Sequence, residues 1–351
     1  MKSLVEKIVT LIRETSSSLP EDVLKALQAA QRKEVKGSSA AVVLKTILDN
    51  CAIAKERGTP LCQDTGTLTF FVDERLRRKV TPAVLKKAVA LATERGYLRK
   101  NTIDSMTGKS YDDNCAEGAP VVHYIGSDRV EIGSASVGLG SDGIAARSKD
   151  SKRLYADSKR PYVDSKRPYV TLILKGGGSE NMSRQYSLPD AALGAGRDLA
   201  GVRACVFDAV QKIQGYGCAP GVLGVCVGGD RATGYEVAKE QLLRPLDEKE
   251  VVESSNRRII EFERRLLREA NTLGIGPMGL GGKTTLLGVK VAARPRVPAS
   301  FFVTVAYMCW ACRRRTLVLS PAVGGRSSAV DKVRQSGDKR QATAVKRNKR
   351  G

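Results

Sequence analysis

Apolar residues recur at helical spacing through the first part of the chain and give way to short alternating or β-branched runs further on. The spacing predicts helices over residues 2–14 and 20–34, and a third helix that begins at Ser38 or Ser39 and ends at Gly58. The run TLTFFVD has the β-branched and aromatic content of a strand, and TPAVLKKAVALATERG returns to a helical pattern. We therefore expect a helical opening followed by mixed elements.

Strands and helices then follow one another without a regular βαβ order. The pattern predicts strands in APVVHYIG, RVEIGSASVG and YVTLILKGG, and helices near residues 191–213, 236–243 and 251–271. A glycine-rich loop leads into the alternating strand LLGVKVAA. We predict an α+β fold, in which a helical N-terminal segment is followed by mixed, largely antiparallel sheets packed with helices.

Two segments differ from the rest of the chain in composition. A seven-residue unit beginning DSKR occurs at positions 150, 157 and 164, and its prolines exclude a coiled coil, so we interpret it as a surface-loop insertion. From Arg313 to the end there are 12 basic and 2 acidic residues, and few apolar ones follow position 320. We expect one domain over residues 1–315, with a repeat-containing loop at 150–170, and a disordered basic tail over 316–351.

The formal net charge of +22 permits several kinds of anionic partner and does not choose among them. The tail has no aromatic residues for base stacking, so we expect only non-specific contact with nucleic acid; a dedicated nucleic-acid arm is the alternative, and it predicts steep salt dependence. No apolar run approaches the roughly 20 residues that cross a bilayer. The N-terminus also lacks a signal-peptide pattern, so we predict a cytoplasmic protein without a membrane span.

The chain has eight cysteines and one histidine, His123. Cytoplasmic thiols stay reduced, so these cysteines indicate catalysis, metal binding or burial rather than disulfides. Only Cys309 and Cys312 have CxxC spacing, which does not support a zinc ribbon, and we interpret both as packing residues. His123 falls on an alternating strand and is interpreted as a core or edge residue rather than a catalytic base.

Two glycine patterns suggest nucleotide binding but lack the context that it requires. Gly138, Gly140 and Gly143 match GxGxxG, yet no amphipathic helix follows to hold a pyrophosphate. The segment GPMGLGGKTT resembles a P-loop, but Pro277 replaces its first glycine and a strand pattern follows where a helix must begin. Either loop could still present backbone N–H groups to an anion.

Two cysteine-containing turns are stronger candidates for chemistry. PLCQDTG places the thiol of Cys62 beside Asp64 between a helix and a strand, and GCAPGVLGVCVGGDRATG places Cys218 before an apolar strand. A thiolate and a carboxylate at one turn can serve one ligand. By composition alone, each segment can equally be an ordinary turn with a buried cysteine.

Six segments, in their order along the chain, resemble the α subunit or N-terminal domain of class I fumarate hydratases and the related L(+)-tartrate dehydratases. They are PLCQDTG, GYLRKN, LKGGGSENMS, CAPGVLGVCVGGDRATGYEVAKEQLLR, NTLGIGPMGLGGKTTLLGVKV and AYMCWACRRR, and the resemblance covers residues 1–315. It implies an iron–sulfur hydro-lyase that reversibly hydrates a small dicarboxylate, fumarate/malate or tartrate. Such enzymes use a [4Fe-4S] cluster on three cysteines, with an open iron as Lewis acid.

The resemblance implies two cluster ligands directly. Cys62 and Cys218 match family ligands, and Ser179 stands where the remaining cysteine is expected. A serine hydroxyl is a poorer iron ligand than a thiolate because its pKa is higher and its oxygen is harder. An alternative hypothesis is therefore a degenerate homologue without a cluster that acts as a binding or scaffold subunit.

The resemblance also implies a substrate pocket and a partner. Gln63 and Asp64 match pocket-lining positions, and Arg99 matches an arginine that binds a substrate carboxylate. Lys175 and Asn181 flank the glycine run and are further candidates for ligand contact. The family completes its active site with a second domain or β subunit that carries the proton-transfer residues, so a β subunit and a dimer of αβ pairs are implied.

Overall fold

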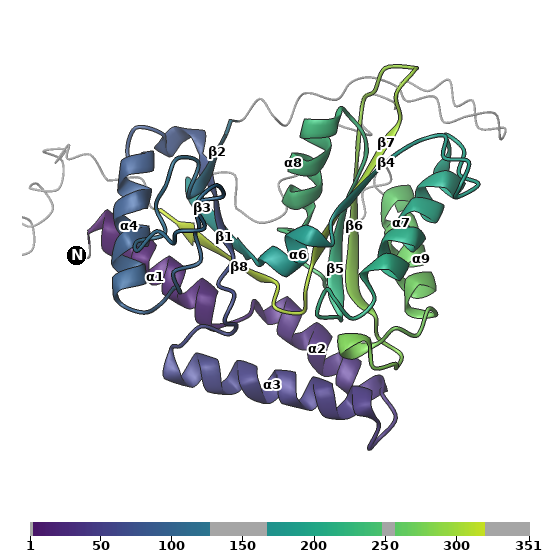
Figure 1. The fold of residues 1–351 in the computed structure, drawn as a ribbon, viewed down its shortest axis with the longest axis horizontal. Helices are drawn as coiled ribbons and strands as arrows, with labels where there is room; N and C mark the ends of the chain where they lie inside the picture. Colours follow the sequence, from purple (N-terminus) through teal and green to yellow (C-terminus); the bar gives the residue numbers. More distant parts are fainter. Residues whose placement is uncertain (1–2, 127–166, 248–256, 320–351) are drawn as a thin grey trace, which may run out of the picture. The chain divides into compact units, whose positions relative to one another are not determined.

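The computed structural model describes residues 3–126, 167–247 and 257–319. The described residues belong to one compact unit that contains helices and two mixed sheets (Figure 1), so the predicted α+β class is confirmed. The GxGxxG motif, the strand predicted in RVEIGSASVG, most of the DSKR repeats and residues 320–351 of the predicted basic tail lie outside the described residues. The predicted boundary at residue 315 falls inside a strand that continues to Val318. No helix within the described ranges is long and apolar enough to cross a membrane.

The predicted helical opening is confirmed as three helices. They are α1 (Leu4–Ser17), α2 (Glu21–Lys33) and α3 (Ser39–Arg57). Ser38 caps α3 by accepting a hydrogen bond from the backbone N–H of Ala41 at 3.2 Å, which satisfies one of the free donors of the first turn. Gly58 ends the helix in the left-handed conformation at φ +66°, which glycine adopts without a steric penalty.

The first sheet has the strand order β2-β1-β3-β8. Its strands are β1 (Thr67–Asp73), β2 (Val121–Ile125), β3 (Tyr169–Lys175) and β8 (Arg313–Val318). The pair β1–β2 is parallel, whereas β1–β3 and β3–β8 are antiparallel. Alternate side chains of β1, namely Leu68, Phe70 and Val72, pack in one buried cluster with residues of α1 and of α4 (Pro82–Glu94). Phe71 is buried in the other direction, and every residue from Leu68 to Asp73 is buried, so β1 is covered on both faces.

The second sheet has the order β4-β7-β5-β6. Its strands are β4 (Arg184–Ser187), β5 (Gly221–Gly228), β6 (Leu286–Arg294) and β7 (Phe302–Met308). The helices α7 (Leu199–Ile213) and α9 (Arg257–Asn271) cover one face, and α8 (Arg231–Gln241) covers the other (Figure 1). The pair β5–β6 is parallel and the other two pairs are antiparallel, in agreement with a mixed, largely antiparallel fold.

Two helices begin at other residues than the periodicity predicts, because capping side chains fix their starts. Asp198 accepts a hydrogen bond from the N–H of Gly201 at 2.7 Å and begins α7, whereas the predicted helix starts at residue 191. Asp230 and Thr233 form a reciprocal capping box that begins α8 before the predicted residue 236. Asp230 is therefore a helix cap.

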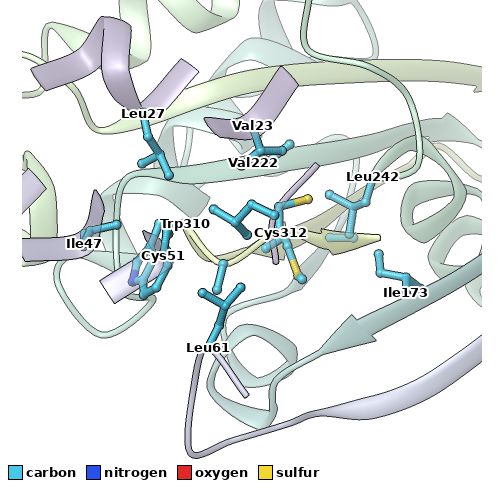
Figure 2. Close-up of a cluster of buried hydrophobic side chains, with 14 of the residues drawn as sticks. Val23, Leu27, Ile47, Cys51, Leu61, Ile173, Val222, Leu242, Trp310 and Cys312 are labelled. Carbon is cyan, nitrogen blue, oxygen red and sulfur yellow. The ribbon is translucent and has the colours of Figure 1, made fainter. Parts of the chain in front are cut away.

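The chain crosses between the two sheets twice. After β3 it passes through Gly176 and the short helix α6 (Gly177–Asn181) into β4, and after β7 it passes through residues 309–312 into β8. A large apolar cluster surrounds the second crossover, and Figure 2 shows Trp310 and Cys312 among side chains of α2, α3 and both sheets. The cluster also contains Leu61, so it packs the second crossover against the loop between α3 and β1.

The P-loop-like segment binds a carboxylate side chain of the protein itself. The carboxylate of Glu34, which directly follows α2, accepts hydrogen bonds from the backbone N–H groups of Lys283 at 2.9 Å and Thr284 at 3.0 Å. Gly282, at φ +120°, leaves room for this approach, since a Cβ there would lie 3.0 Å from Glu34 Oε2. β6 follows as predicted, so the glycine loop fastens α2 to the second sheet and has its anion-binding donors already filled.

Replacing Glu34 by alanine should lower the free energy of unfolding by about 2–4 kcal/mol, because charge-assisted hydrogen bonds are lost and the amides of Lys283 and of buried Thr284 lose their acceptor. Urea unfolding of the variant measures this change. Glu21→Ala is the control: Glu21 makes an exposed ion pair with Lys25, so its unfolding curve should stay at the wild-type position. Equal curves for Glu34→Ala and the wild type would contradict this role for the loop.

Candidate functional site

The loop between α3 and β1 carries Cys62 and is anchored at the residue before it. The N–H of Leu61 donates to Ser16 O at 2.9 Å, and its carbonyl accepts from Asn50 Nδ2 at 3.0 Å. The Leu61 side chain is buried in the apolar cluster of Figure 2. With Leu61 fixed inside, Cys62 is half-buried and Gln63 is exposed.

Asp64 ties this loop to the first crossover. Its Oδ2 accepts from the N–H of Gly177 at 2.7 Å, and its Oδ1 accepts from the N–H of Gly66 at 2.9 Å and from Asn101 Nδ2 at 3.1 Å. A Cβ on Gly176 would lie 2.8 Å from Asp64 Oδ2, so this close approach requires glycine. Both carboxylate oxygens of Asp64 are therefore engaged by N–H donors.

A cavity of about 390 Å³ opens beside Cys62. Gln63 and Arg99, two residues predicted to line a substrate pocket, border it together with Cys62. The backbone of Arg99 is held on both sides: its N–H donates to Thr65 Oγ1 at 3.3 Å, and its carbonyl accepts from Asn114 Nδ2 at 2.8 Å. Its guanidinium-bearing side chain stays exposed.

Asn114 is a residue that the sequence pattern did not indicate. It is 1% exposed, and its Oδ1 accepts from the N–H groups of Asn101 at 2.8 Å and Thr102 at 3.0 Å. With its bond to the Arg99 carbonyl, its side chain fixes the segment from Arg99 to Thr102. No short motif marks such a residue, because its side-chain partners lie 12 to 21 positions away along the chain.

Cys218 lies in the loop between α7 and β5 in an unusual conformation. Its φ is +51°, a left-handed value that costs a non-glycine residue about 1–2 kcal/mol. Its carbonyl accepts from the N–H of Trp310 at 3.2 Å, and the next carbonyl, of Ala219, accepts from the N–H of Met278 at 2.9 Å. The loop is thus fastened to the second crossover, and a cysteine occupies a position where glycine would be less strained.

The thiols of Cys62 and Cys309 both lie near the thiol of Cys218. Burial raises the pKa of Cys218, and the nearby thiols of Cys309 and Cys62 raise it further, followed by the carboxylate of Asp64. Cys309, interpreted from its sequence context as a packing residue, lies half-buried at the start of the second crossover. It packs against the apolar clusters of both sheets, as predicted, but the sequence did not indicate that it lies near Cys218.

Ser179 contacts Cys309 through the backbone. It is buried in α6, and its Oγ accepts a hydrogen bond from the Cys309 N–H at 3.1 Å. This bond joins the two crossovers between the sheets. Ser179, predicted to stand at a cluster-ligand position, therefore lies beside the thiol group and positions one member of it.

The other cysteines are remote or buried. Cys312 is completely buried, as its predicted packing role requires, and burial raises its pKa to about 11. Burial likewise raises the pKa of Cys51 and Cys115 to about 11 and of Cys205 and Cys226 to about 12. None of these five thiols is among the groups that act on Cys218.

A buried lysine network borders the thiols. Lys175, at the end of β3, is 2% exposed, and its Nζ lies 3.0 Å from Glu180 Oε2 and donates to Ser183 Oγ at 3.2 Å. Glu180 also pairs with Lys239 at 2.7 Å. Burial lowers the pKa of Lys175 to about 8, although the charge of Glu180 opposes this shift. Asn181, the other flanking candidate, is exposed at the end of α6.

His123 lies away from these groups, within the first sheet. Its ring stacks on Phe71 with centroids 5.1 Å apart, and its Nδ1 lies 3.3 Å from Glu236 Oε1. It occupies the edge strand β2, as the alternating pattern predicts. These contacts are those of an edge residue that joins β2 to α8.

The donor set suits a cluster better than a single ion. Within the described ranges, no group of three or more His, Cys, Asp or Glu side chains is arranged to hold one metal ion. A single ion needs all its donors within about 2.3 Å of one point, whereas an iron–sulfur cluster attaches each thiolate to a different iron, so its donors stand further apart. Cys62, Cys218 and Cys309 come from three different loops, and three thiolates are the number and kind of donors that such a cluster takes.

Comparison with known proteins identifies the family. The family described as fumarate hydratase (Fumerase) matches over residues 5–154 and 146–318. A putative fumarate hydratase class I from Geobacillus stearothermophilus is 42% identical over 92% of this chain, which spans 56% of that protein. A putative L(+)-tartrate dehydratase subunit alpha from Methanocaldococcus jannaschii is 30% identical over 88% of this chain and 94% of its own length. The L(+)-tartrate dehydratase subunit alpha of Escherichia coli is 26% identical over 91% of each chain. The match to the family model over most of the sequence, together with the ordered motifs and the fold, shows that this chain belongs to the fumarate hydratase (Fumerase) family.

Proposed function

We propose that this chain is the α-type part of a hydro-lyase that adds water to, or removes it from, a small dicarboxylate. One observation carries the proposal: the thiols of Cys62 and Cys309 both lie near that of Cys218, and Cys62 borders the cavity that Gln63 and Arg99 also line. The names of the relatives include fumarate and L(+)-tartrate as substrates. Either dicarboxylate has a size and charge that such a cavity can admit.

The three thiols are the groups that would hold a [4Fe-4S] cluster in this proposal. Bound through three cysteines, such a cluster keeps one iron without a protein ligand, and that iron supplies Lewis-acid chemistry to a substrate hydroxyl and carboxylate. Ser179 then holds the backbone of Cys309 and is not itself a ligand. In this proposal Cys309 supplies the third thiolate. The serine at position 179, where a cysteine was expected, is then no argument for the alternative of a scaffold subunit without a cluster.

The pocket residues bind and orient the substrate. The Arg99 guanidinium, fixed at its backbone by Thr65 and Asn114, pairs with one carboxylate in bidentate fashion. The exposed amide of Gln63 hydrogen-bonds the substrate on the side next to Cys62. Asp64, engaged by three N–H donors, keeps the loop and the first crossover in register.

The complete enzyme needs a second part in this proposal. The Geobacillus relative extends well beyond the region that this chain matches, and two relatives are named as alpha subunits, so we infer a β subunit and a dimer of αβ pairs. The β part carries the proton-transfer groups. The hydro-lyase domain then runs through β8 to Leu319 rather than ending at residue 315, and 320–351 form a separate basic tail. The eight unpaired cysteines fit a reducing cytoplasm.

Single replacement of Cys62, Cys218 or Cys309 by serine should abolish cluster binding, because a hydroxyl does not replace a thiolate on iron. Each variant is purified anaerobically with a tartrate-dehydratase-type β subunit, loaded with iron and sulfide, and analysed for both elements and for hydration of fumarate. Iron, sulfide and hydration should fall to background in all three. Cys115→Ser, which alters a half-buried cysteine elsewhere, should match the wild type. Normal iron and sulfide in Cys309→Ser, or none in the wild type, would refute the proposal.

Ser179→Cys should leave the iron content and the hydration rate unchanged, because Cys309 already supplies the third thiolate. Ser179→Ala should lower the free energy of unfolding by about 1–2 kcal/mol, since the half-buried Cys309 N–H loses its acceptor. Iron analysis tests the first statement and urea unfolding the second. A large gain of iron in Ser179→Cys would instead assign the ligand position to residue 179.

Arg99→Met should reduce kcat/KM for the dicarboxylate roughly 100-fold, which corresponds to the loss of one carboxylate pair. Steady-state hydration assays of the assembled enzyme measure it. Arg95→Met is the matched control, because Arg95 pairs with Glu6 on the protein surface and does not border the cavity. Equal losses in both variants would show a general effect of removing positive charge.

A further inference from the structure

Tyr307 is a buried side chain whose polar group the proposed function does not use. It lies on β7 opposite Leu223 of β5 and is 1% exposed. Its ring occupies the space beside Gly217 and Gly221, which flank the Cys218 loop, and a Cβ on either glycine would collide with it. The two glycines thus allow a tyrosine to lie under the loop that carries Cys218.

The hydroxyl of Tyr307 has no hydrogen-bond partner among the described residues. Its backbone N–H, by contrast, donates to Ser183 Oγ at 3.2 Å. A buried hydroxyl without a partner destabilises a protein by its full desolvation penalty, and native structures contain few of them. Phenylalanine would fill the same space without that penalty. We therefore expect the hydroxyl to have a hydrogen-bond partner that is bound only in the functional protein.

The surroundings of Tyr307 indicate which ligand that is. A Cβ on Gly221 would lie 2.4 Å from the Tyr307 hydroxyl oxygen, and one on Gly217 would lie 2.4 Å from the ring, so the phenol lies directly against the loop of Cys218. Cys309 packs against the same buried cluster that contains Tyr307. Two of the three thiols assigned to the cluster therefore flank this one phenol.

We propose that the Tyr307 hydroxyl donates a hydrogen bond to a sulfur of the iron–sulfur cluster, either the Cys218 thiolate or a neighbouring sulfide. This inference rests on the proposed function, since it assumes that Cys62, Cys218 and Cys309 hold the cluster. Tyr307 is then a positioning residue. Hydrogen bonds to cluster sulfur stabilise the more negative, reduced state and raise the reduction potential.

Tyr307→Phe tests the proposal, because it removes the hydroxyl and keeps the ring. Without cluster, the variant should unfold at the same temperature as the wild type or at a higher one, since an unpaired donor is removed. With cluster, its midpoint potential should become more negative, and its visible absorbance should decay several-fold faster in air, where dioxygen takes an electron from the cluster. The hydroxyl thus has opposite effects in the two forms, which a purely structural role would not produce.

Tyr186→Phe is the matched control in the same sheet. Its hydroxyl donates to Asp208 Oδ2 at 2.8 Å, so the variant should be less stable with and without cluster and should keep the wild-type potential and decay rate. A loaded Tyr307→Phe protein with unchanged potential and decay would overturn the inference alone. A wild-type protein that takes up no iron and sulfide would overturn the proposed function, and the inference with it.

Discussion

The site depends on two crossovers of the chain between separate sheets. The hydrogen bond from the Cys309 N–H to Ser179 Oγ joins these crossovers, although the two residues are 130 positions apart. Because β3 and β8 belong to one sheet and β4 and β7 to the other, any relative shift of the sheets would separate Ser179 from Cys309. The apolar cluster in Figure 2, which encloses Trp310 and Cys312, opposes such a shift.

Close backbone approach is the second constraint on the site. The carboxylate of Asp64 reaches the Gly177 N–H only because Gly176 has no side chain, and Gly66, at φ +82°, passes against the carbonyl of Lys175. Gly66 and Gly176 are the residues whose missing side chains permit this approach. In the folded protein they let the loop of Cys62 and the first crossover touch, which is a packing role that local sequence does not distinguish from anion binding.

The charge of the chain also has a different distribution from the one that composition suggests. Much of the excess of basic residues lies in the C-terminal stretch, but the cations that border the site are Lys175, Lys239 and Arg99. Glu180 is shared by two lysines, so this network keeps a net positive charge next to the thiols. A site with that balance attracts anions.

The sequence by itself determined the helices with capping residues, the alternating strands and the loops that carry Cys62 and Cys218, because period and turn chemistry depend on near neighbours. It also determined that the P-loop-like segment precedes a strand. Only the tertiary structure decided that Cys309 lies near the other two thiols and that Ser179 holds its amide. Only the fold showed that the Glu34 carboxylate accepts hydrogen bonds from the glycine loop, 249 positions away along the chain. Such pairings arise when buried faces of distant elements pack together, and no local pattern encodes which distant loops then meet.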